Sequence, residues 1–181
     1  MVFFVIMKYT ELYVQILLIV KSKRDVDLFF ESRNTPRDSE DTLTRQTHFF
    51  IYDHYTKETL LMRFYDDSNP EEYKLIKKDI HELQKKLGSP NKDDEKKFWK
   101  YLHIYQWLIN RTKKYNDIVF KLVMIQLKGN QTSFSLEWGK DPVMFYVDED
   151  QDDSYRDLVK MTKMIQSLEE MAEEDDQMNI L

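Results

Sequence analysis

The chain has 181 residues, of which 41% are hydrophobic, 33% are charged and none is cysteine. This length and composition fit one folded domain and exclude a wholly disordered chain, collagen and a membrane-embedded bundle. The formal net charge of -6 hides an asymmetry, because residues 148–176 carry -9 and residues 1–147 carry +3. The sequence therefore predicts a slightly basic body with an acidic end.

Two apolar runs, residues 1–7 and 12–20, open the chain. Charged and polar residues interrupt them and no cleavage-site pattern follows, so we expect neither a membrane span nor a signal peptide. The short run at 12–20 is rich in Val and Ile, which predicts a strand, then a charged turn and a second strand at 26–30. A single amphipathic helix over residues 10–31 is the alternative. The polar stretch 32–46 is expected to be a loop.

A hairpin is predicted from residues 47–55 and 60–65, which places His48, Phe50, Tyr52 and His54 on one face by strand alternation. After this hairpin, a proline and two glutamates mark the start of a helix. Apolar residues then recur at spacings of three and four up to residue 87, which predicts one core-facing stripe. Gly88 is expected to end this helix.

A second helix is predicted over residues 93–115, and it is apolar around most of its circumference. We therefore expect it to be the most buried helix, with Trp99 and Trp107 in the core. Strands are predicted at 118–127, 132–138 and 142–147, followed by a helix that Ser154 begins.

These elements predict an α+β fold, in which an antiparallel sheet of hairpins is covered by two central helices and a C-terminal helix. Residues 1–172 are interpreted as a single α+β domain, and residues 173–181 as an acidic C-terminal tail.

Glycine and cysteine are scarce in a way that excludes several catalytic classes. Three glycines at positions 88, 129 and 139 cannot form a P-loop or a dinucleotide-binding loop. No serine lies between two glycines in the spacing of a nucleophile elbow. The lack of cysteine excludes thiol nucleophiles, disulfides and Cys-ligated metal clusters, and it fits a reducing, cytoplasmic location. We expect no cofactor.

The two central helices carry a lysine-rich face. Residues 70–114 contain twelve basic and seven acidic side chains. Such a face can follow a phosphate backbone or meet an acidic partner, although it can equally be a solvated surface. The candidate nucleic-acid-binding residues are Lys74, Lys78, Lys85, Lys96 and Lys100.

An acidic run precedes the last helix, and it is the candidate partner-binding segment. Its residues are Asp148, Glu149, Asp150, Asp152 and Asp153. It lacks the glycine and the distal glutamate of an EF-hand loop, so no metal site is assigned to it. The run can instead start a helix, or it can bind a basic partner such as a nucleic-acid-binding protein in competition with nucleic acid.

One group of residues is a candidate for metal-dependent hydrolysis, which needs carboxylates and a base around a metal-bound water. Glu137 and Lys140, together with Asp117 or Asp148, are the residues concerned, although strands of a hairpin commonly end in such side chains. Four histidines occur at positions 48, 54, 81 and 103. His48 and His54 share a predicted strand face but lie six residues apart, and the other two are on separate helices. The four histidines form a zinc site or an acid–base pair only if folding brings two elements together.

Together these patterns predict a non-enzymatic, intracellular protein-interaction module that occludes a macromolecular partner sterically and electrostatically. An inhibitor or immunity-type factor fits this description. Lysine outnumbers arginine 20 to 7 and alanine occurs once, which indicates an AT-rich genome such as that of a phage, virus or mobile element. The alternatives are a nucleic-acid-binding protein that uses the lysine-rich face, and a metal-dependent nuclease or hydrolase.

Overall fold

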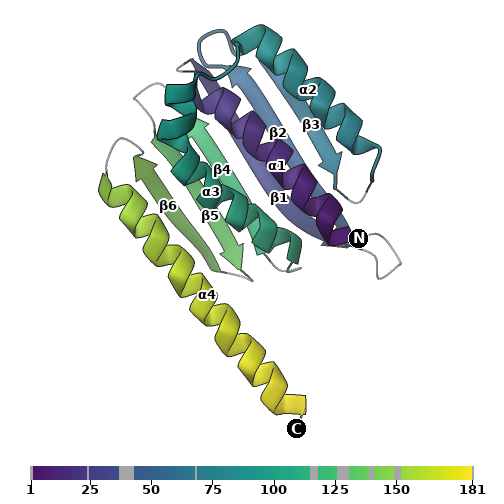
Figure 1. Ribbon diagram of the computed structural model, residues 1–181, viewed down its shortest axis with the longest axis vertical. Helices are drawn as coiled ribbons and strands as arrows, with labels where there is room; N and C mark the ends of the chain where they lie inside the picture. The colour runs from purple at the N-terminus through teal and green to yellow at the C-terminus, as the bar shows by residue number, and fades with distance from the viewer. Residues whose placement is uncertain are drawn as a thin grey trace.

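Six strands form one antiparallel sheet, and four helices lie on one of its faces, in the computed structural model (Figure 1). The structure describes residues 2–23, 25–36, 43–67, 69–114, 118–125, 131–138, 141–148 and 152–180. The elements in chain order are α1 (Val2–Lys21), β1 (Val26–Pro36), β2 (Leu43–Asp53), β3 (Thr59–Asp66), α2 (Glu72–Leu87), α3 (Lys92–Lys114), β4 (Ile118–Ile125), β5 (Gln131–Trp138), β6 (Asp141–Asp148) and α4 (Asp152–Ile180). The predicted α+β fold is confirmed.

The strand order in the sheet is β3-β2-β1-β4-β5-β6, and every neighbouring pair is antiparallel. Strand β1 pairs with both β2 and β4, so strands β1–β3 form one half of the sheet and strands β4–β6 form the other. The helices α2 and α3 therefore come between the two halves of the sheet in sequence, and both pack on the same face as α1 (Figure 1).

The first helix corrects the strand predicted at residues 12–20. These residues belong to α1, which packs against α2, α3 and β1. Within Tyr9–Val20, where the side chains are described, only Glu11 and Gln15 are exposed. A helix that is buried on nearly all sides has no amphipathic period, so its Val- and Ile-rich sequence resembles that of a buried strand. The alternative helix over 10–31 is right only as far as Lys21.

The loop predicted at residues 32–46 is also corrected. Strand β1 extends through Pro36 and β2 begins at Leu43, so most of this polar stretch is a paired hairpin. Ladder hydrogen bonds come from the backbone, and polar side chains in these strands do not prevent pairing. Residues 37–42 lie outside the described part of the chain.

The remaining predicted elements are found with small changes in their ends. Helix α2 ends as expected at Gly88, whose φ of 84° is in the region that favours glycine and whose N–H donates to the Gln84 carbonyl at 2.8 Å. Helix α4 runs to Ile180, so the backbone of residues 173–180 is helical. Among the described residues, no helix is long and apolar enough to cross a membrane.

The core lies between the sheet and its helices. The rings of Phe30, Phe49 and Phe120 come from three adjacent strands, and Phe30 meets the other two edge to face at centroid distances of 4.9 and 5.9 Å. All three are fully buried. Helix α3 adds Tyr105 and Leu108 to this layer, and α1 is buried still more completely.

Buried carboxylates connect the helices to strands β2 and β3. The hydroxyl of Tyr13 on α1 donates to Asp67, and the Thr47 hydroxyl on β2 lies 3.3 Å from the same carboxylate. The hydroxyl of Tyr65 on β3 donates to Asp79 on α2 at 2.7 Å. Burial, together with the Asp79 carboxylate, raises the pKa of Tyr65, so this phenol stays protonated and continues to donate.

We expect Leu17→Ala to lower the free energy of unfolding by about 2–5 kcal/mol, because it leaves a cavity around a fully buried side chain of α1. Gln15→Ala, at an exposed position on the same helix, is the matched control and should change it by about 0.5 kcal/mol at most. Urea unfolding followed by circular dichroism measures both. Equal effects of the two substitutions would contradict the burial of α1.

Candidate functional site

The two faces of the sheet differ in what covers them. Successive residues of a strand point to opposite faces, and directly paired residues share a face. The register aligns Phe29 with Phe50 and Met62, and it aligns Glu31 with His48 and Phe64. These residues alternate with the core residues that face the helices, so they lie on the opposite side of the sheet.

We call this second side the open face, because no described helix packs on it. Its described apolar and aromatic side chains are half-buried or exposed. They are Phe29, His48, Phe50, Tyr52, Met62, Phe64 and Val123. Met62 and Phe64, on the edge strand β3, are 58% and 65% exposed. The open face is therefore an aromatic surface that the fold leaves in contact with solvent.

The rings of the open face contact one another in two groups. The imidazole of His48 stacks on the Phe64 ring with a centroid distance of 4.0 Å and an interplanar angle of 9°. Phe29 meets the same imidazole edge to face at 5.9 Å. Phe50 and Tyr52 lie 5.1 Å apart on the neighbouring part of β2. These contacts hold the exposed rings in fixed positions, which preorganises the surface.

Charged groups of both signs lie on the same side of the sheet. Arg33 pairs with Glu31, and the His54 Nδ1 lies 2.6 Å from a carboxylate oxygen of Asp27. The ammonium group of Lys57 lies over the Tyr52 ring at 5.6 Å. An aromatic centre with charged groups beside it has the composition of a protein interface.

His48 is the polar group at the centre of the open face. Burial lowers its pKa, since it disfavours the charged ring; Glu31 opposes this effect and Arg33 adds to it. Its Nε2 atom is buried without a hydrogen-bond partner. The ring is therefore a largely neutral aromatic surface with one unused hydrogen-bonding nitrogen.

The lysine-rich face is divided by the fold. Lys74, Lys78 and Lys85 are exposed on α2, and Lys96 and Lys100 are exposed on α3. Helix α1 lies between α2 and α3 (Figure 1). The five lysines therefore belong to two separate surfaces, one on α2 and one on α3.

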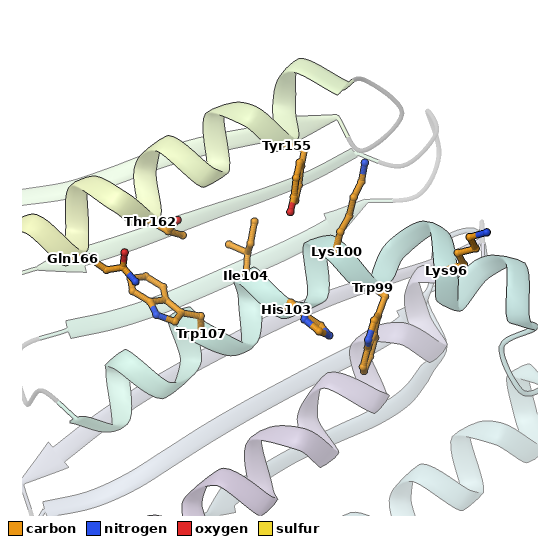
Figure 2. A pocket seen from close by; sticks show the side chains of 9 residues that line it. All are labelled: Lys96, Trp99, Lys100, His103, Ile104, Trp107, Tyr155, Thr162 and Gln166. Atoms are coloured by element: carbon orange, nitrogen blue, oxygen red, sulfur yellow. The ribbon is translucent and has the colours of Figure 1, made fainter.

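Lys96 and Lys100 line a hollow between α3 and α4, together with Trp99 and Trp107 (Figure 2). Trp99 is 43% exposed, so the prediction that it belongs to the core is wrong. Trp107 is half-buried and packs against the edge of the core. The apolar surface of α3 is wider than its buried part, and Trp99 lies outside that buried part.

The acidic run lies mostly outside the described residues. Glu149 and Asp150 are not described, and neither is the side chain of Asp152. Asp148 is the last residue of β6 and pairs with Gln131. Asp153 is exposed, and its carboxylate lies 3.2 Å from the guanidinium of Arg156.

The hydrolase candidates are partly placed by the backbone. Glu137 on β5 pairs with Pro142, whereas Asp148 pairs with Gln131 at the other end of that strand. Six residues of strand separate these ends by about 20 Å, so Asp148 is not beside Glu137. Asp117 and Lys140 lie outside the described residues. Where side chains are described, no three His, Asp or Glu residues come together as a metal site.

The four histidines contact different partners. His48 stacks on Phe64, and His54 pairs with Asp27 at the end of β2. His103 on α3 meets Trp99 at 4.8 Å, and His81 is exposed on α2.

The comparisons with known proteins add no function. No family model, no curated protein and no solved structure matches this chain.

We expect His48→Gln to reduce the pH dependence of stability. Because folding lowers the His48 pKa, the unfolded chain takes up this proton more readily, and the wild type loses stability as the pH falls from about 7.5 to about 5. The His48→Gln variant lacks this contribution, so its free energy of unfolding should fall less over the same pH range. Urea unfolding at both pH values gives the comparison.

His81→Gln is the matched control, since it removes an exposed histidine of α2 and leaves the His48 ring in place. It should keep the wild-type difference between the two pH values. If His48→Gln also keeps that difference in full, folding does not lower the pKa of His48.

Proposed function

We propose that this protein is a non-enzymatic interaction module that binds a partner protein through the open face of its sheet. The observation that supports this most directly is the exposure of Met62 and Phe64, at 58% and 65%, beside the stacked ring of His48. Contiguous exposed apolar surface of this kind marks an interaction site on a folded protein.

The chemistry of the open face favours a protein as the partner. Aromatic residues and methionine are enriched in protein interfaces, whereas lysine and glutamate are depleted from their centres. Here rings and Met62 form the central part, and the Glu31–Arg33 pair balances its own charge. The part of the open face whose side chains are described thus has no excess of positive charge to attract phosphates.

Occlusion is the mechanism that this surface supports. The open face is part of a sheet held rigid by the helices behind it, so it can cover a partner's surface without rearranging. Full burial of one large apolar side chain such as Phe64 contributes about 1.5–3 kcal/mol. An inhibitor or immunity-type factor, acting inside the cell and encoded by a phage, virus or mobile element, is the specific form that we propose.

Phe64→Lys should weaken partner binding by about tenfold or more, because it places a charge among the apolar side chains of the interface. The matched control is Met164→Lys on α4, where the methionine is 66% exposed but lies on the helical side of the molecule. Tagged wild type and both variants are used to capture proteins from extracts of the source cells, which mass spectrometry then identifies.

The proposal requires a protein that wild type and Met164→Lys retain and Phe64→Lys loses. Equal recovery of every captured protein by all three would contradict it. Sedimentation of the purified chain is the second measurement. A dimer that Phe64→Lys dissociates would show that the open face binds a second copy of this chain, and that the partner is not a different protein.

A further inference from the structure

We propose that the hollow between α3 and α4 binds a nucleobase with its attached phosphate, as a free nucleotide or within single-stranded nucleic acid. This site is on the helical side of the sheet, so it is separate from the open face and from the proposed protein partner.

The hollow has the size of a small-ligand site. Its volume is about 590 Å³, within the range of roughly 300–1,000 Å³ that such sites occupy. Helix α3 forms one wall and α4 the other (Figure 2). The lining residues are Lys96, Trp99, Lys100, His103, Ile104, Trp107, Tyr155, Thr162 and Gln166.

The charge of the lining favours an anion. Lys96, Lys100 and His103 are basic, and none of the nine described lining residues is acidic. The Lys100 ammonium lies 4.8 Å from the Tyr155 ring centre, and these two side chains approach each other from α3 and α4 (Figure 2). A cation is thereby held between α3 and α4, where a phosphate can meet it.

The aromatic residues favour a planar ring on that anion. Trp99, His103 and Trp107 follow one another at intervals of four residues, which places them along one side of α3. Trp99 is 43% exposed, although an indole of this size is usually more buried. Aromatic platforms beside lysines are the elements that bind bases and phosphates of single strands.

Polar groups of α4 complete the lining. The exposed amide of Gln166 can donate and accept hydrogen bonds, as the edge of a base requires. The Thr162 hydroxyl donates to the Val159 carbonyl at 2.8 Å, and its oxygen can still accept. A simple acidic peptide has no ring to use the indoles and no base edge to use the amide.

A second hollow favours a strand over a free nucleotide. It has a volume of about 520 Å³, lies on the α1 side of α3, and shares Lys96 and Trp99 with the first. Lys92 lines it as well, together with one acidic residue, Glu95. A chain of nucleotides can therefore continue past Trp99 from one hollow to the other.

Fluorescence anisotropy of a labelled ten-nucleotide thymidylate strand, titrated with the full chain at about 50 mM salt, tests the site. Trp99→Ala should weaken binding by roughly five- to 100-fold, and Trp99→Phe should recover most of it. The double substitution Lys96→Gln/Lys100→Gln should make the slope of log affinity against log salt less steep by about 1.4. Each side chain is exposed, and circular dichroism confirms that the variants fold.

The matched control is Lys74→Gln/Lys78→Gln, which removes the same charge from exposed positions on α2. It should stay within about twofold of the wild type. A titration with thymidine monophosphate in competition with the strand separates the two sources. If the monophosphate competes with an affinity equal to that of the strand, the ligand of the hollow is a free nucleotide. If it competes much more weakly, the ligand is a single strand.

Three results would overturn the proposal. The first is no binding of either probe at low salt, and the second is an equal loss of affinity in the α2 control. The third is insensitivity to Trp99→Ala combined with equal competition by polyglutamate, which would show attraction of any anion without recognition of a base. None of these results bears on the open face.

Discussion

The burial of α1 is the constraint on which the rest of the structure depends. Most of its described side chains are apolar and buried, and Tyr13, Ile16 and Leu17 are fully buried. Such a helix needs neighbours on nearly every side, and it finds them in the sheet below and in α2 and α3 beside it. This arrangement places α1, α2 and α3 on one face of the sheet, where α4 also packs against α3 and β6. The opposite face is left open as a direct consequence.

The buried carboxylates determine which residues of β3 the open face presents. Asp79 receives hydrogen bonds from Tyr65 and from Arg63 at 3.1 Å, so both side chains must point toward α2. A buried carboxylate without these donors would cost several kcal/mol, which penalises any shift of register. Strand alternation then directs Met62 and Phe64 outward. The polar pairs inside the protein thus position the rings outside it.

Periodicity explains what could be predicted from the sequence and what could not. The β2–β3 hairpin and α2 have clear periods of two and 3.6, and both are found where they were expected. Helix α1 has no clear apolar stripe because nearly all its sides are covered, so a strand was predicted instead. Alternation placed His48 and Phe50 on one face of their strand. It could not say which face the helices would cover, since that depends on contacts between α1 and distant strands.

A sheet with one covered face and one open face requires that adjacent residues of β3 differ sharply in access to solvent. Hydroxyl-radical footprinting of the purified chain, read by mass spectrometry, measures this residue by residue. Met62 and Phe64 should be modified rapidly, while Tyr65, which is 1% exposed, should be protected. Protection of Phe64, or equal modification of Phe64 and Tyr65, would contradict a sheet with one covered face and one open face.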